Sequence, residues 1–339
     1  MSNSTKLKNR YYGVTGVEVV NGMLNTDFDH LPPTTYNDIP RASNFSYKYP
    51  MKKYYKMLGN PVLGLKQPKN LKNKLVCKTI DETFTDDTGI ELKKETDSRK
   101  VLKKLFEYKD VKQTGIVFAV GNNNIGINGA AQISDGINLD KDTNLKEDVN
   151  GTPFRNSNES KSDSQNTTLG TRNILDHAIF GFPFSVVPET YKVYEKILEG
   201  FEGYTEEDFE LFKKATLHGV SHVNSVAKSG CTNAFAIFIK CKENTMPIMA
   251  NLHLYISYER IGLMYNRIIG NLNITELIQY LSPKVNKIED IEIYIQPFIL
   301  SVVANINGEK VTINNNNSEK LFDGKVPVRF YEIEEEGLL

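Results

Sequence analysis

The alternation of apolar and polar residues along the chain predicts a mixture of strands and helices. Extended apolar runs predict strands over residues 11–20, 114–120, 174–187 and 234–241, with further candidates at 252–257, 292–304 and 326–331. Helical spacing predicts helices over residues 97–108, 206–216 and 274–281. Because strands and helices do not alternate strictly, the pattern indicates the α+β class.

One further amphipathic helix is expected in the N-terminal third. Ser46 is a suitable N-cap, Pro50 then falls in the first turn, and Gly59 ends the helix. The spacing of the apolar side chains places them on one face: Met51, Tyr54, Tyr55 and Leu58. Lys48, Lys52 and Lys56 recur at every fourth residue and form a separate stripe, with Lys53 beside it.

Aromatic residues precede and enter this helix. Phe45, Tyr47 and Tyr49 have side chains that stack on bases in single-stranded RNA, although aromatic residues more often belong to a core. The sequence leaves both interpretations open.

Charge is segregated around the same helix. No acidic residue occurs from Ile39 to Thr79, where about five would be expected at the average composition of the chain. Ten basic residues lie in that stretch: Arg41, Lys48, Lys52, Lys53, Lys56, Lys66, Lys69, Lys72, Lys74 and Lys78. Since the net charge is −1, any affinity for nucleic acid must come from such a local patch. A solvated lysine-rich surface is the alternative.

A polar segment interrupts the pattern between residues 137 and 169. It has few apolar residues and no clear periodicity, which is typical of a surface insertion. The segment is slightly acidic, so we do not expect it to bind phosphate by charge alone.

Motifs for catalysis, metals and membranes are absent from the sequence. It contains no GxSxG, HExxH or Walker A motif, and the pair His218 and His222 has no evident third metal ligand. The N-terminal sequence has no apolar core of a signal peptide, and no apolar run is long enough to span a membrane. Three cysteines without a CxxC pair favour a reducing compartment. We therefore expect a cytoplasmic protein without a metal or cofactor.

Three segments together resemble the crRNA-binding backbone subunit of type I CRISPR Cascade complexes. They are GTRNILDHA at residues 170–178, YTEED at 204–208, and SVAKSG at 225–230 ahead of an apolar strand. Their order and spacing are similar to Cas family seven, and most similar to its type I-B branch. The N-terminal third is less similar.

This resemblance implies a fold and a function. The family fold is a modified RNA-recognition-motif, ferredoxin-like palm, so we expect a single domain over residues 1–339 with insertions. Residues 59–110 would form a finger and residues 137–171 a thumb. The implied function is that of a non-enzymatic subunit, which assembles in several copies along the crRNA and holds it for pairing with target DNA. The implied partners are other copies of the chain, a large subunit, a family five subunit and a processing endonuclease.

The resemblance also implies RNA-binding residues. Those of the N-terminal basic segment are Arg41, Ser43, Lys48, Lys52, Lys53 and Lys56, and those of the later segments are Gln132, Arg172, Asn173, His177 and Lys228. The sequence departs from the family at residues 42–48, and Val226 and Ala227 replace polar and basic neighbours of Lys228. Because of these departures, we expect fewer contacts with RNA in these two segments.

The loop after the first strand offers an alternative function. Asp27, Asp29 and His30 cluster there, and in related type III backbone subunits an aspartate of an early loop cuts target RNA. A loop with paired carboxylates can bind Mg²⁺ or orient a 2′-hydroxyl. A metal-dependent endoribonuclease using Asp27 and Asp29 is therefore the alternative, and a polar loop without chemistry is the simpler interpretation.

Overall fold

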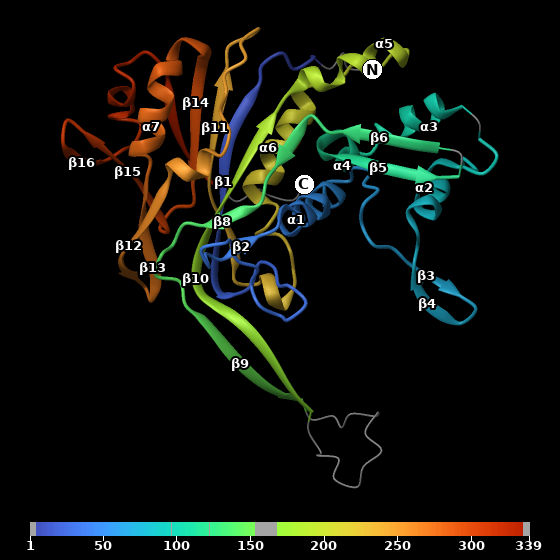
Figure 1. Cartoon of the computed structure of the whole chain (residues 1–339), viewed down its shortest axis with the longest axis horizontal. Helices are drawn as coiled ribbons and strands as arrows, with labels where there is room; N and C mark the ends of the chain where they lie inside the picture. The colour runs from blue at the N-terminus through green and yellow to red at the C-terminus, as the bar shows by residue number, and fades with distance from the viewer. Residues whose placement is uncertain (1–4, 96, 122, 153–167, 335–339) are drawn as a thin grey trace.

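A nine-stranded sheet forms the centre of the molecule (Figure 1). The computed structural model describes residues 5–95, 97–121, 123–152 and 168–334. The strands run in the order β17-β14-β11-β1-β10-β8-β2, and β7 and β9 also pair with β10. Their bounds are β1 Tyr11–Gly22, β2 Arg41–Ala42, β7 Ala131–Ile133, β8 Gly136–Asn138, β9 Leu145–Thr152, β10 Thr168–Val186, β11 Cys231–Cys241, β14 Ile288–Ile295 and β17 Val328–Glu332.

Strand β1 occupies the middle of this sheet and pairs antiparallel with β10 on one side and β11 on the other. The register with β11 shifts between Gly16 and Val17, which is a β-bulge. Val14 and Val17 are fully buried, so β1 is covered from both faces. The strands predicted at residues 11–20, 174–187 and 234–241 are thus confirmed, and β10 begins six residues earlier than predicted.

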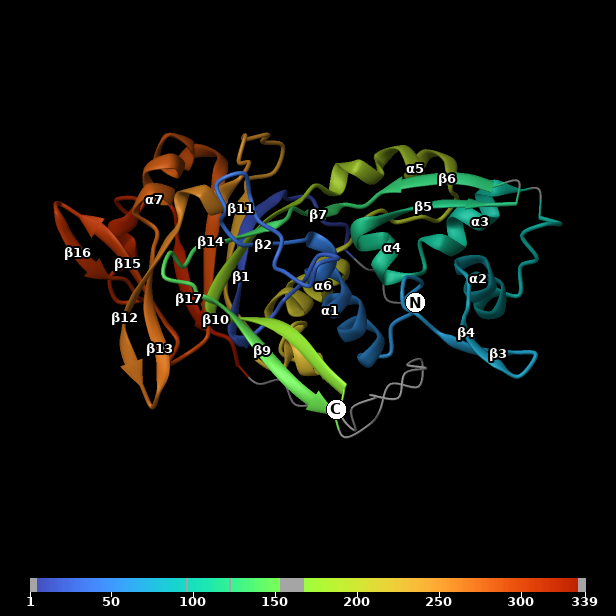
Figure 2. The same ribbon diagram turned by 60° about the horizontal axis from the view of Figure 1, so that its bottom comes forward.

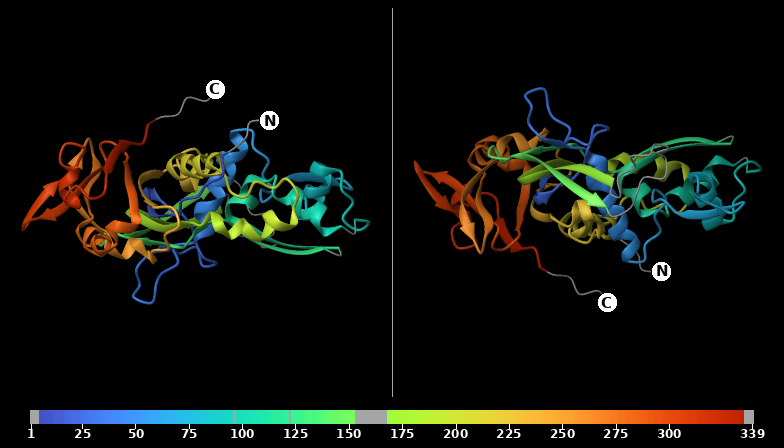
Figure 3. Two further views of the ribbon diagram at one scale, coloured as in Figure 1. Left: turned by 90° about the horizontal axis from the view of Figure 1, so that it is seen from above. Right: turned by 90° about the horizontal axis from the view of Figure 1, so that it is seen from below.

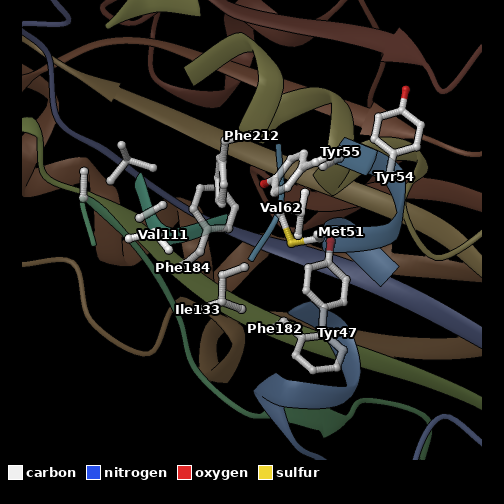
Figure 4. Close-up of a cluster of buried hydrophobic side chains, with 14 of the residues drawn as sticks. Tyr47, Met51, Tyr54, Tyr55, Val62, Val111, Ile133, Phe182, Phe184 and Phe212 are labelled. Carbon is white, nitrogen blue, oxygen red and sulfur yellow. The ribbon is translucent and has the colours of Figure 1, made fainter. Parts of the chain in front are cut away.

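Two helices pack side by side against one face of the sheet: α1 Asn44–Met57 and α6 Glu206–His218 (Figure 2). Tyr47 of α1 stacks on Phe182 of β10, with ring centroids 4.7 Å apart. Phe212 of α6 meets Phe184 of β10 edge-on at 5.5 Å, and these rings belong to the core cluster in Figure 4. Within the described ranges, no helix is long and apolar enough to cross a membrane.

The other face of the sheet packs against the C-terminal part of the chain. Val14, Ile179 and Ile237 of the central strands share a core with Leu272 of a second, four-stranded sheet. That sheet has the order β12-β13-β15-β16, with bounds β12 Ser257–Met264, β13 Arg267–Asn273, β15 Leu300–Ile306 and β16 Glu309–Thr312. Helix α7 Thr275–Leu281 confirms the helix predicted at residues 274–281.

Two strand predictions in this region are wrong. Residues 252–257 contain a short 3₁₀ helix, η3 Leu252–Tyr255, ahead of β12. Residues 292–304 are divided between β14 and β15, which belong to different sheets, because the chain turns between them with Phe298 at a positive φ of 65°. The last candidate, at residues 326–331, corresponds to β17.

A lateral lobe, which we define as residues 59–128, projects from the end of the molecule opposite the C-terminal sheet (Figures 1 and 3). It contains β3 Pro68–Leu71, β4 Lys74–Cys77, α2 Ile80–Thr88, α3 Ser98–Leu105, α4 Lys109–Thr114, β5 Gly115–Val120 and β6 Asn123–Asn128. The predicted helix at 97–108 is therefore shorter than expected, and the predicted strand at 114–120 is confirmed as β5. The remaining elements of the described residues are η1 Pro188–Tyr191, α5 Lys192–Ile197, η2 Val226–Lys228, η4 Ser282–Lys287 and η5 Ser318–Leu321.

A buried carboxylate joins the lateral lobe to the body. Asp208 closes the capping box of α6 with Thr205, and its side chain has no exposed surface. Lys109 and Lys112 of α4 reach it with Nζ–Oδ distances of 2.8 and 2.5 Å. Burial alone would raise the pKa of Asp208, but the two lysines outweigh burial and lower it. The carboxylate is therefore ionised and paired.

Removing the charge of Asp208 should loosen this junction. We expect Asp208→Asn to lower the free energy of unfolding by about 3 kcal/mol, because two partly buried ammonium groups lose their counter-ion. Urea denaturation measures the change. The matched control is Asp323→Asn, whose carboxylate pairs with Lys325 at the surface and whose loss should not measurably change stability. Equal effects of the two substitutions would contradict the assignment.

Candidate nucleic-acid interface

Helix α1 begins three residues earlier than predicted. Ser43 is the N-cap and accepts a hydrogen bond from the amide of Ser46 at 3.3 Å, so the prediction that Ser46 caps the helix is wrong. Asp135 also supports this end, since its Oδ1 accepts from the Asn44 amide at 2.8 Å. As a result Pro50 lies inside the helix rather than in its first turn. Gly59, at φ 79°, follows the last turn as expected.

The aromatic residues of α1 divide between the core and the surface. Tyr47 is fully buried, and its hydroxyl donates to the Thr216 carbonyl oxygen at 3.0 Å and lies 3.0 Å from the Thr15 hydroxyl. Phe45 is 78% exposed and Tyr49 is 40% exposed. Because residues four apart share a helix face, Phe45, Tyr49 and Lys53 form one outward row. The Lys53 ammonium lies 5.2 Å from the centre of the Tyr49 ring, a cation–π distance.

The predicted lysine stripe runs beside this outward row, but its members differ in environment. Lys48 is half-buried, and burial together with the neighbouring Lys52 lowers its pKa. Lys52 is committed to the lateral lobe, since its Nζ lies 3.4 Å from Oδ2 of the buried Asp110. Lys56 is exposed and lines a cavity of about 350 Å³ together with acidic residues of the lobe. Among the described residues, the lobe forms an ion pair with Lys52 but none with Lys48, Lys53 or Lys56.

Predicted residues from two separate segments of the sequence meet at the N-terminus of α1. Arg41 precedes the helix, and its Nη1 lies 3.1 Å from Asp135, the residue that also supports the helix end. Ser43 uses its hydroxyl as the cap. Lys228 arrives from η2, and its ammonium donates to the Leu24 carbonyl oxygen at 2.7 Å. The structure thus brings the predicted Arg41, Ser43 and Lys228 together.

Gln132 belongs to another part of the surface. It lies on β7 and its Nε2 donates to the Gly129 carbonyl oxygen at 3.0 Å. It lines a cavity of about 480 Å³ together with Tyr12, Met246 and Ile248, and none of the other predicted residues lines that cavity. The structure does not join it to the α1 cluster.

Arg172 and Asn173 lie midway along the long hairpin formed by β9 and β10, which projects from the sheet in Figure 1. The Arg172 Nε donates to Asp148 on the opposite strand at 2.9 Å. Asn173 donates to the His30 carbonyl oxygen at 3.0 Å and so ties the hairpin to the loop after β1. Both residues line an apolar cavity of about 250 Å³ that Met23, Ile174 and Val226 also line.

His177 does not reach the surface. Its side chain has no exposed area, and its ring lies between two carboxylates, with Nδ1 2.6 Å from Asp140 and Nε2 3.4 Å from Glu18. This conformation does not allow the direct contact with RNA that the resemblance implied. Burial alone would lower the pKa of His177, but hydrogen bonds to Asp140 and then Glu18 outweigh burial and raise it.

His177 is part of a larger ionic cluster, which we define as Glu18, Asp140, Asp176, His177, Arg260 and Arg267. Arg260 of β12 lies 2.8 Å from Asp140 and 3.8 Å from Asp176, and Arg267 of β13 pairs with Glu18. Asp176 also accepts from the Asn144 amide at 2.7 Å, next to the start of β9. The ionic cluster thus fixes the C-terminal sheet to the base of the hairpin.

The carboxylate of Asp27 already has a structural partner. Its Oδ1 accepts from the amides of Asp29 and Leu31 at 2.9 and 3.0 Å, which folds the loop on itself. In the part of the chain that the structure describes, no three His, Cys, Asp or Glu side chains are placed to hold a metal ion. Among the described residues, Asp27 and Asp29 are therefore not part of such a group.

Comparisons with known proteins give one family and several similar structures. The family model described as CRISPR-associated protein Cas7 matches residues 9–275. A chain of a solved "CRISPR RNA-guided surveillance complex, pre-nicking" has a TM-score of 0.51 at 11% identity, covering 84% of this chain and 92% of that chain. A second chain, of a "CRISPR RNA-guided surveillance complex", has a TM-score of 0.45 at 10% identity over 84% and 88%. No curated protein matches.

The ionic cluster makes stability depend on pH. A histidine whose pKa is raised in the folded state stabilises fully below its unfolded pKa, near 6.5, and loses this contribution as the pH rises through the folded pKa. The pKa values of Asp140 and Asp176 are lowered despite burial, so these two residues lose their contribution to stability only in acid. We therefore expect the stability difference between wild type and His177→Gln to shrink from pH 6 to pH 9 in urea denaturation. A difference that stays constant or grows would show that His177 is neutral in the cluster.

Proposed function

Because this chain belongs to the Cas7 family of CRISPR-associated proteins, we propose that it is the crRNA-binding backbone subunit of a type I surveillance complex. Several copies would line the guide RNA and hold it for pairing with target DNA, in the cytoplasm and without an enzymatic step of their own. The large subunit, the family five subunit and the processing endonuclease are the proposed partners. The assignment to subtype I-B rests on the three sequence segments that resemble that branch.

The strand order supports a palm of the RNA-recognition type. The central strands follow the order β11-β1-β10-β8, helix α1 follows β1 in the chain, and helix α6 follows β10. A β-α-β-β-α-β unit with this order is ferredoxin-like. We propose that the finger includes residues 59–110 and continues to the end of the lateral lobe at 128, and that the thumb, at residues 137–171, is the hairpin of β9 and β10.

The observation that carries the proposal is the outward row of α1. Phe45 and Tyr49 expose aromatic faces, and Lys53 lies beside them with Lys48 and Lys56 on the neighbouring stripe. Single-stranded nucleic acid is held by this combination, since aromatic rings stack on bases and cations follow the phosphates. Neither contact reads a base edge, so we propose binding with little sequence preference.

Reversing the charge of three α1 lysines should weaken RNA binding. We expect Lys48→Glu, Lys53→Glu and Lys56→Glu together to lower affinity for a single-stranded RNA and to reduce the salt slope by about 2, because each phosphate contact on a single strand contributes roughly 0.7. Lys52 is kept, since it pairs with Asp110. Filter binding over a range of salt concentrations measures both quantities.

The matched control reverses three lysines of the C-terminal region, Lys310, Lys320 and Lys325, which changes the net charge equally. Equal losses in the two triple variants would mean that net charge, and not α1, determines binding. The same reactions with Mg²⁺ and complementary RNA test the enzymatic alternative. Regular cuts that disappear in Asp27→Ala would support a nuclease instead.

The long hairpin supports assembly of copies. Among the described residues, its outer strand β9 pairs only with β10, and its exposed apolar side chains include Leu145 and Val149. A two-stranded ribbon without further packing is marginal in water. A contact with a neighbouring copy would cover it, and head-to-tail contacts of this kind build open filaments.

Shortening the hairpin should therefore affect assembly more than folding. Residues 149–171 can be replaced by Asn-Gly, because Asp148 and Arg172 already face each other across the two strands. We expect the variant to keep the unfolding midpoint and the affinity for a short RNA, but to lose filaments on a guide-length RNA in electron microscopy. Filaments of normal length would place the contact between copies elsewhere.

A further inference from the structure

The Lys228 side chain points into the protein rather than to a free surface. Its ammonium donates to the Leu24 carbonyl oxygen at 2.7 Å and lies 3.5 Å from the Ser46 carbonyl oxygen. Leu24 belongs to the loop after β1 and Ser46 to the first turn of α1, so one side chain bridges two segments. Burial lowers the pKa of Lys228, in agreement with a group removed from solvent.

The Ser46 carbonyl needs an outside donor because of Pro50. In an α-helix the carbonyl of residue 46 accepts from the amide of residue 50, and proline has no amide hydrogen. A helical carbonyl without its intrahelical partner must bond to water or to a side chain. Lys228 is the side chain that the structure places there.

A second contact joins the same two segments. The Asn25 Oδ1 accepts from the Ser43 amide at 2.6 Å, directly before α1 begins. The loop after β1, the start of α1 and η2 therefore form one junction, with Lys228 bonded on both sides. The outward row of α1 starts at this junction with Phe45.

We infer that Lys228 is a positioning residue for the proposed RNA interface and not a phosphate contact. It holds the first turn of α1, which lacks one intrahelical hydrogen bond because of Pro50, against the loop after β1. This contact sets the direction in which the side chains of Phe45 and Tyr49 point. This inference rests on the proposed function for its RNA readout. The part that concerns the contact of Lys228 with the first turn of α1 can be tested without RNA.

The test is a double-mutant cycle between Lys228→Met and Pro50→Ala. Methionine has the length of lysine without its donors, and alanine returns an amide hydrogen to the Ser46 carbonyl. We expect Lys228→Met to lower the urea midpoint, and to lower it less when residue 50 is alanine. Equal shifts in both backgrounds would overturn the link to Pro50.

RNA binding separates a positioning role from a contact. We expect Lys228→Met to weaken affinity at every salt concentration while leaving the slope of log K against log salt unchanged. The matched control is Lys56→Met, which should reduce that slope by about 0.7 and leave the urea midpoint unchanged. A Lys228→Met variant that behaves like Lys56→Met would show that Lys228 is a phosphate contact.

Two further outcomes are decisive. If Lys228→Met does not fold but the double variant with Pro50→Ala does, the positioning role is supported directly. If the wild-type protein binds no RNA, the proposed function fails, and the urea midpoints still decide whether Lys228 holds the junction.

Discussion

The structure depends on one constraint: strand β1 is covered on both faces and paired on both edges. A polar side chain on such a strand has no access to water and must find a partner within the protein. Thr15 meets Tyr47 of α1 on one face. Glu18 meets His177 and Arg267 on the other. These two contacts add polar links to the apolar packing of α1 and of the C-terminal sheet against β1.

Helix α1 combines stability and recognition by dividing its faces. The inner face supplies Tyr47 and Met51 to the core shown in Figure 4, and the outer face keeps Phe45 and Tyr49 exposed. A rigid core face fixes the rotation of the helix about its axis, so the exposed rings have a defined direction. A mobile loop with the same residues would lose more conformational entropy on binding.

The sequence predicted local features well and distant pairings poorly. The strand over residues 11–20 and the helix over residues 206–216 depend on neighbouring residues and were confirmed. The sequence left the role of Tyr47 open, and the structure shows that its side chain is buried, four residues before the buried Met51. The environment of His177 could not be predicted from the sequence, because Asp140, Glu18 and Arg260 come together around it from separate parts of the chain. The glutamate between two valines at residues 17–19 is a local signal of a buried charge that needs partners.

Strand β10 extends from the central sheet into the projecting hairpin, and this continuity limits how the hairpin can change in length. Its inner part pairs with β1 and its outer part, from Leu175 to Thr168, continues without a break into the projecting hairpin. Side chains on a strand alternate between faces, so one inserted residue would turn every position beyond it to the opposite side. During divergence the hairpin can therefore lengthen or shorten only in steps of two residues on each strand, unless a bulge restores the alternation of side chains between the two faces. The number of residues in each strand of the hairpin should therefore differ between relatives by an even number.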